Sequence, residues 1–284
     1  MDYTLREWVQ MAGEGSLAEA AILAQMNESM MSREQVTGIM REHLQCMKEA
    51  VRNGLDAGLR SVSGLTGGQS SLLQRHVLSG KSLCGSLLGK AEAYALATAE
   101  SNACMGKIVA APTAGACGIL PGALLAMAEE RGVDDDTAVN ALFVAGAVGQ
   151  SIATAASISG AEGGCQAECG SAAAMTAAAL CYLCGGTAQQ SADAAGFAIM
   201  NLLGLVCDPV GGLVEVPCVY RNVGASGIAF TAADMVLAGI RCPIDPDEVL
   251  AAMKEVGDAL PSSLRETGEG GCAACPSICS RLRH

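Results

Sequence analysis

Helical periodicity runs along most of the chain, and no segment shows the sustained period-two alternation of apolar and polar residues that marks a half-buried strand. Aromatic residues make up only 3% of the sequence, whereas 35 of its 284 residues are glycine. A core with so few rings has to be built by helices whose backbones approach closely. The sequence therefore predicts an all-α fold, a single compact domain over residues 1–284, in which glycine-rich loops connect Ala/Gly-rich buried helices.

Capping signals and apolar spacing place the individual helices. Residues 1–60 form an amphipathic helical part, in which Ser32 and Gln35 match a capping box for a helix over residues 33–53. The acidic residues 134–136 suit the N-terminus of the apolar helix that follows them. Further helices are expected over residues 89–105, 121–131, 171–184, 191–203, 225–240 and 245–256, whereas residues 61–71, 110–118, 159–170 and 206–222 are too rich in glycine or proline to be regular helix.

Residues 139–161 run for 23 positions without a charge, which is long enough to cross a bilayer. The segment consists mostly of alanine, glycine, serine and threonine, and it has neither an aromatic belt nor asymmetric basic flanks. We therefore expect a core helix that is buried on all sides, and no membrane partner.

The charge balance limits the classes of partner. The chain has 17 basic and 29 acidic side chains, a net charge of −12, which speaks against nucleic acid. Its N-terminus is mixed in charge and lacks the apolar stretch of a signal peptide. We expect a cytoplasmic protein whose 14 cysteines are reduced and mostly serve as small buried residues.

Three cysteines stand out because glycine or proline interrupts the helix around them. They are Cys165 in a Gly-Cys-Gln turn, Cys207 in Cys-Asp-Pro, and Cys218 after Pro217. In such breaks the peptide N–H groups are free to point at sulfur, as cluster sites require. Spacings of 42 and 11 residues match no short metal motif, so buried thiols and a cluster both remain open at this point.

Five runs of sequence carry a resemblance to a known family. They are SGLTGG (63–68), MGKIVAAPTAGACGILPG (105–122), SGAEGGCQAECGSA (159–172), LLGLVCDPVGGLVEVPC (202–218) and AADMVLAGI (232–240). In order and over essentially the whole chain, they resemble the alpha subunit of iron-sulfur-dependent L-serine dehydratase. The resemblance implies a single catalytic domain that belongs to an enzyme of amino-acid catabolism and gluconeogenesis.

The same resemblance implies a cofactor and a reaction. Cys165, Cys207 and Cys218 fall on the three cysteines that hold one 4Fe–4S cluster, whose fourth iron stays open and acts as a Lewis acid. The family eliminates water from L-serine and releases pyruvate and ammonia without a redox change. It implies an oxygen-sensitive lyase, L-serine ammonia-lyase, without pyridoxal phosphate. A beta subunit is the expected partner.

Two glycine-rich loops are candidates for binding the carboxylate of the amino acid. Residues 63–68 and 112–118 are rich in glycine, serine and threonine and can form nests of N–H donors, although turns and helix caps have the same composition. Asn102 matches an asparagine of the family's pattern and is expected either to orient substrate or to brace a helix. The candidate substrate-binding residues are Ser63, Thr66, Gly67, Gly68, Thr113 and Gly115.

The catalytic base is not identified by the sequence. His43 is expected on a face of an amphipathic helix, His76 lies in a segment without a family motif, and His284 is the last residue, so we interpret each as structural or solvated. Glu162 and Glu168 flank Cys165, where a carboxylate can have a tuned pKa or can simply form supporting hydrogen bonds. We hypothesise that the missing histidine is supplied by the beta chain.

The tail, residues 268–284, departs from the family's pattern. Cys272, Cys275 and Cys279 have C-x-x-C-x-x-x-C spacing, which is typical of a cluster site. Three interpretations remain open: a second cluster, an extra ligand to the first cluster, and an exposed thiol-rich end.

Other functions use similar features. An L-cysteine desulfidase would follow the same elimination chemistry. A ferredoxin-type electron carrier would need four ligands rather than three. A pyridoxal phosphate enzyme would need a lysine beside a phosphate loop, and only Lys107 lies near such a loop.

Overall fold

The computed structural model describes residues 2–279. Within this range no strand forms, apart from an isolated bridge that pairs Cys207 with Arg265, so the predicted all-α class is confirmed. The helices are α1 (Leu5–Ala12), α2 (Leu17–Ser29), α3 (Arg33–Gly54), α4 (Gln69–Leu78), α5 (Gly85–Ala103), α6 (Ile119–Arg131), α7 (Asp135–Ala155), α8 (Gly160–Gly163), α9 (Ser171–Leu183), α10 (Ala188–Met200), α11 (Cys218–Leu237), α12 (Pro246–Ala259) and α13 (Pro276–Cys279).

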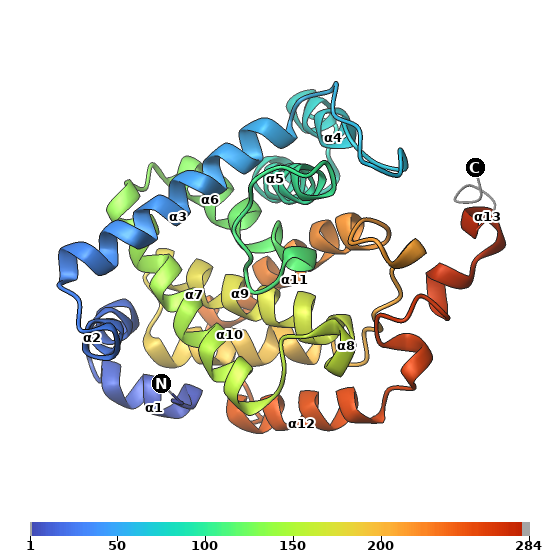
Figure 1. Ribbon diagram of the computed structural model, residues 1–284. Helices are drawn as coiled ribbons and strands as arrows, with labels where there is room; N and C mark the ends of the chain where they lie inside the picture. The colour runs from blue at the N-terminus through green and yellow to red at the C-terminus, as the bar shows by residue number, and fades with distance from the viewer. Residues whose placement is uncertain (1, 280–284) are drawn as a thin grey trace.

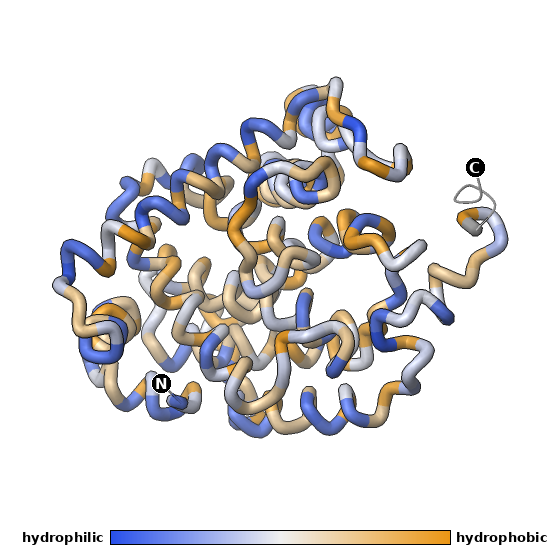
Figure 2. Tube along the Cα trace, in the orientation of Figure 1, coloured by the Kyte–Doolittle hydropathy of each residue, from blue (hydrophilic) through white to orange (hydrophobic). Residues whose placement is uncertain are grey.

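Helix α9 lies in the middle of the fold and contacts α7, α10, α11 and α6 (Figure 1). Its residues from Ser171 to Cys181 are all buried, and most of them are alanine. The outer side of α3 is hydrophilic, whereas the central helices are apolar (Figure 2). The core is therefore formed by small side chains packed around one helix that is buried along all but its last two residues.

Glycines allow the helices around α5 to approach at backbone distance. A Cβ atom built on Gly54 of α3 would lie 1.9 Å from the carbonyl oxygen of Ala97, and one on Gly122 of α6 would lie 2.5 Å from the Ala95 nitrogen. No side chain fits at such distances. The expectation of a core built by close backbones is met at these contacts.

Several predicted helix starts are confirmed. The Ser32 hydroxyl and the Gln35 side chain form the expected capping box of α3, and the Asp134 carboxylate accepts a hydrogen bond from the Thr137 N–H at the start of α7. Several predictions were wrong. The short helix α8 lies within residues 159–170, which were expected to be irregular. Helix α4 was not expected, and α11 begins at Cys218 rather than at residue 225, because Pro217 occupies its N-cap position and does not interrupt it.

Helix α7 is the one described helix that is long and apolar enough to pass a test for membrane spans. Of its most apolar window, 67% is buried inside the fold, as in the core helix of a globular protein. The expectation that it is buried on all sides was wrong, because Gly146 and the last turn are exposed.

Candidate active site

Cys165 is held by a turn that only glycine can make. Gly164 has φ +75°, and a Cβ atom there would lie 2.5 Å from Leu260 Cδ1 and 2.8 Å from the Leu205 oxygen. Cys165 itself has helical angles and directly precedes the π-helical turn η2 (Gln166–Gly170), which runs into α9. The thiol is therefore placed at the start of the central helix.

The buried side chain of Gln166 fixes this turn against its neighbours. Its Nε2 donates to the Met253 oxygen at 2.8 Å, and its Oε1 accepts from the Gly204 N–H at 2.8 Å. The Gln166 N–H donates to the Leu205 oxygen at 2.9 Å. Residues 204–205 lead directly to Cys207, so these bonds tie the first thiol segment to the second.

Cys207 lies in extended backbone that pairs with the tail. Its N–H donates to the Leu264 oxygen at 2.9 Å, and its carbonyl accepts from the Glu266 N–H at 2.7 Å. The thiol is 3% exposed. A segment nearly sixty residues later in the chain is thus required to position it.

Cys218 is the first residue of α11. The expectation that glycine or proline keeps the backbone non-helical around all three cysteines is correct for Cys207 only, because Cys165 and Cys218 stand at helix starts. A helix start still offers N–H groups without partners inside the helix, so the physical reason for the expectation holds at these two positions.

Glu168 joins the thiol segments to a loop from elsewhere in the chain. Its Oε1 accepts a hydrogen bond from the Thr113 hydroxyl at 2.8 Å, and its Oε2 lies 3.7 Å from the Cys207 sulfur. A Cβ atom on Gly160 would lie 2.5 Å from Oε2 and 2.9 Å from that sulfur, and one on Gly115 would lie 3.1 Å from Oε1. Two glycines therefore leave the space that the carboxylate occupies.

The thiols influence one another electrostatically. Burial, together with the charges of Cys165 and Glu168, raises the pKa of Cys218 to about 12. Burial and the charges of Glu168 and Cys165 also raise the pKa of Cys207. A hydrogen bond joins the sulfurs of Cys165 and Cys169, which are 3.3 Å apart, and lowers the pKa of Cys165. Three thiolates in this place would need a positive partner.

Arg221 is a site residue that the sequence analysis missed. Its guanidinium pairs with the buried Asp208 carboxylate at 2.7 Å and donates to the Val206 oxygen at 2.8 Å, and its charge interacts with that of Cys165. Residues three apart on a helix share a face, so a helix beginning at Cys218 would have indicated Arg221.

The hydrogen-bond donors of loop 63–68 bind carboxylates of the protein itself. The hydroxyls of Ser63 and Thr66 each donate to Glu215 at 2.6 Å. The Gly67 N–H donates to Glu100 at 3.0 Å, as does that of Gln69. The predicted nest of N–H groups exists at the start of α4, where it binds the Glu100 carboxylate of α5. These bonds give Gly68 no role in binding a ligand.

Replacing Glu215 by glutamine is expected to lower the free energy of unfolding by about 2–3 kcal/mol at pH 7, because hydrogen bonds to a buried charge are lost. Burial raises the pKa of Glu215, but hydrogen bonds from Ser61, Ser63 and Thr66 outweigh it and leave the pKa lowered. The carboxylate therefore stabilises the fold above the ordinary glutamate pKa of about 4.3, and this contribution is lost as pH falls through the lowered value.

The measurement is urea unfolding followed by circular dichroism, at pH 7 and at several lower pH values. The difference between Glu215→Gln and the natural protein should narrow on acidification. Glu130→Gln, on the exposed end of α6, is the control and should leave the unfolding curve unchanged. A difference that is independent of pH would contradict this account.

The remaining predicted residues are placed as follows. The Asn102 side chain donates to the Ala114 oxygen at 3.3 Å and so braces the loop that carries Thr113 and Gly115. Glu162 is exposed and accepts from Ser157 at 2.6 Å. Of the two glutamates that flank Cys165, the structure brings Glu168 to the thiols.

The tail lies beside the Cys207 segment. The Cys272 N–H donates to the Asp208 carboxylate at 2.6 Å, and a Cβ atom on Gly271 would lie 2.2 Å from the same oxygen. The Cys272 and Cys275 side chains are exposed. Cys279 ends α13, and its side chain lies outside the described part of the chain, as do residues 280–284 with His284.

The residues that the structure describes contain no group of three or more His, Cys, Asp or Glu side chains already arranged around a single metal ion. Cys165, Cys207 and Cys218 nevertheless come from three separate segments to one buried region, with a carboxylate and an arginine beside them. This fold and site define an all-helical protein with a buried, charge-coupled set of thiols. Thiolates are the ligands that iron-sulfur clusters take.

Comparison with known proteins identifies the family. Residues 13–273 match the family model described as serine dehydratase alpha chain, so the chain belongs to that family. It is 48% identical to a probable L-serine dehydratase, alpha chain, of Bacillus subtilis, over 92% of this chain and 87% of the relative. It is 53% identical to the L-serine dehydratase, alpha chain, of Peptoniphilus asaccharolyticus, over 69% of this chain and 67% of the relative.

Some relatives are longer. An L-serine dehydratase of Streptomyces coelicolor is 46% identical over 63% of this chain, but the match covers only 40% of that relative. Most of that relative therefore lies outside the match.

Proposed function

We propose that this chain is the alpha chain of an L-serine dehydratase and converts L-serine to pyruvate and ammonia by α,β-elimination of water. The observation that carries the proposal is the approach of Glu168 to the Cys207 thiol, beside Cys165, in a member of the serine dehydratase alpha chain family. An elimination needs a group that transfers a proton, and the Glu168 carboxylate lies beside the thiols.

The proposal assigns Cys165, Cys207 and Cys218 as ligands of one 4Fe–4S cluster. All three thiols are buried, and thiolates are the ligands that iron-sulfur clusters take. When bound, the cluster would supply a Lewis acid for the serine hydroxyl, since three protein ligands leave one of four irons open.

Glu168 is the proposed proton-transfer residue of this chain, and it acts together with a base that the beta chain supplies. Thr113 binds Oε1, which orients the carboxylate and leaves Oε2 on the side of Cys207. Arg221 holds the segments of Cys165 and Asp208 together and brings a positive charge to the thiols. Substrate contacts by Ser63, Thr66, Gly67, Gly68, Thr113, Gly115 and Asn102 remain predictions, and the observed bonds of this region brace the two loops.

The tail thiols are the proposed source of any extra ligand. The bond from Cys272 to Asp208 supports this, because Asp208 follows Cys207 directly. Cys275 and Cys279 follow within the same tail. We place the enzyme in the cytoplasm, where thiols stay reduced.

We expect the purified alpha chain, reconstituted anaerobically with iron and sulfide, to show at most about 1% of the activity that it shows with its beta chain, since a general base contributes about 10²- to 10⁴-fold. The relatives named alpha chain and the longer relative matched over only 40% support a second component. Pyruvate formation from L-serine is the measurement.

The same assay with L-cysteine tests the desulfidase alternative. Preference for L-serine supports the proposal. Full activity of the alpha chain alone would overturn the part of the proposal that takes the base from a beta chain, and turnover of L-cysteine alone would overturn the substrate.

A further inference from the structure

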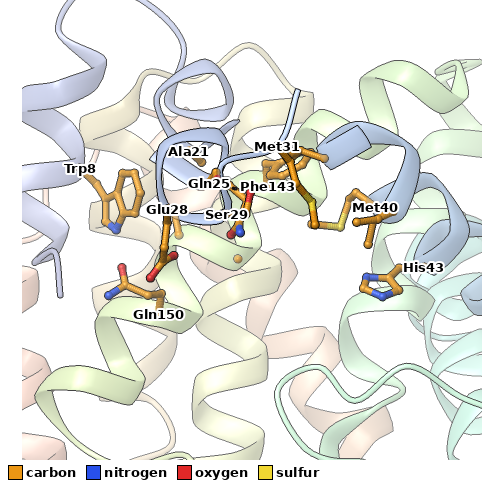
Figure 3. Close-up of a pocket in the computed structure, with 14 residues that line it drawn as sticks. Trp8, Ala21, Gln25, Glu28, Ser29, Met31, Met40, His43, Phe143 and Gln150 are labelled. Carbon is orange, nitrogen blue, oxygen red and sulfur yellow. Dashed lines mark hydrogen bonds between the residues drawn. The ribbon is translucent and has the colours of Figure 1, made fainter. Parts of the chain in front are cut away.

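A second concave site lies away from the thiols, between α1, α2, α3 and α7 (Figure 3). It has a volume of about 400 Å³, within the range of small-molecule sites. No residue of the thiol site lines it. The dehydratase reaction therefore gives it no role.

The indole of Trp8 gives this cavity an unused hydrogen-bond donor. Trp8 is 2% exposed, and its Nε1–H has no hydrogen-bond partner within the described residues. A buried indole N–H ordinarily has a partner, because leaving it without one is costly. The Tyr3 ring packs edge-on against the indole, with 5.0 Å between the ring centroids, and holds it in place. The donor is thus preset for an acceptor that enters the cavity.

The rest of the lining has two characters. In Figure 3 the indole nitrogen lies on the side of Glu28 and Gln150, whereas Met31 and Met40 lie at the other end, with His43 beside Met40. Ile39 and Phe143 add to the apolar surface. The site therefore offers a carboxylate and a donor at one end and mainly apolar side chains, with one imidazole, at the other.

We propose that this cavity binds an apolar α-amino acid. Its carboxylate oxygen accepts from the Trp8 Nε1–H, its ammonium group lies by the Glu28 carboxylate, and its side chain packs among the methionines and Phe143. L-serine lacks the apolar side chain and is expected to bind at least about tenfold more weakly, since each methylene in an apolar pocket discriminates about tenfold or more.

Trp8 is the only tryptophan of the chain, so tryptophan fluorescence reports on this cavity alone. We expect titration of the full-length alpha chain with L-leucine or L-methionine to give a saturable change with half-saturation at about 0.1–1 mM, as suits a ligand of this size. 4-Methylpentanoate, which is leucine without its amino group, should bind at least about tenfold more weakly.

Gly146 provides a variant that blocks the cavity. It lies in the lining on α7, and a Cβ atom there would meet no atom within 4 Å, so Gly146→Phe is expected to fold. It should weaken leucine binding at least about tenfold. Gly224→Phe on α11, also without an atom within 4 Å of its Cβ, is the matched control and should bind leucine as the natural protein does.

Glu28→Gln is a second variant, on an exposed position of α2. It should weaken leucine binding and leave 4-methylpentanoate binding unchanged. The proposal is overturned if the natural protein shows no saturable change up to about 20 mM ligand, or if both variants bind leucine normally with native circular dichroism. None of these readouts depends on dehydratase activity, so this proposal and the proposed function succeed or fail separately.

Discussion

Serine in place of Cys165, Cys207 or Cys218 is expected to remove the iron-sulfur cluster and to lower serine dehydratase activity at least about 10³-fold. A serine hydroxyl does not replace a soft thiolate ligand of iron, and loss of a residue behind a metal ligand already costs about 10- to 100-fold. Each thiol comes from a different segment, so each variant removes the ligand that its segment supplies.

The measurement is the iron and sulfide content and the cluster absorption of each anaerobically reconstituted variant, with pyruvate formation in the presence of the beta chain. Cys181→Ser is the matched control, because Cys181 is fully buried in α9, farther along the helix that follows Cys165. It should keep both cluster and activity. If all three ligand variants keep cluster and activity, the assignment of the site is wrong.

The Glu168→Gln substitution is expected to lower kcat about 10²- to 10⁴-fold with the cluster content unchanged. Glutamine has the shape of glutamate and still accepts a hydrogen bond from Thr113, but it does not transfer a proton. The geometry that supports this is the 2.8 Å bond to Thr113 and the 3.7 Å approach to the Cys207 sulfur.

Glu162→Gln is the matched control for this prediction. Glu162 lies three residues before Cys165, as Glu168 lies three after it, but it is exposed and bonded to Ser157. Its kcat should change less than about twofold. A normal kcat in Glu168→Gln, or an equal loss in Glu162→Gln, would show that Glu168 does not transfer the proton.

The two glutamates show what sequence alone leaves undecided. Both flank Cys165 at equal distance along the chain, so local sequence ranks them equally. The π-helical turn after Cys165 carries Glu168 toward Thr113 and Cys207, whereas Glu162 lies on the short helix α8 before that turn. The two glutamates thus differ in role because of Thr113, more than fifty positions before Glu168, and Cys207, almost forty positions after it.

Arg221 shows a different limit. The run with two prolines over residues 206–222 predicted irregular backbone, and α11 nevertheless begins inside it at Cys218. A proline before the first turn of a helix removes no bond that the helix needs. Once the true start is known, the spacing of Cys218 and Arg221 on one helix face follows directly.

By itself the sequence determined the helical class, the close-packed core of small residues and the three thiols singled out by glycine and proline, because periodicity and backbone restrictions are local properties. Only the tertiary structure decided which groups meet. Loop 63–68 was a candidate nest for a substrate carboxylate, yet the N–H groups of Gly67 and of the adjacent Gln69 bind Glu100 of α5. Local sequence sets which donors a loop exposes, whereas the packing of distant helices decides which acceptor reaches them.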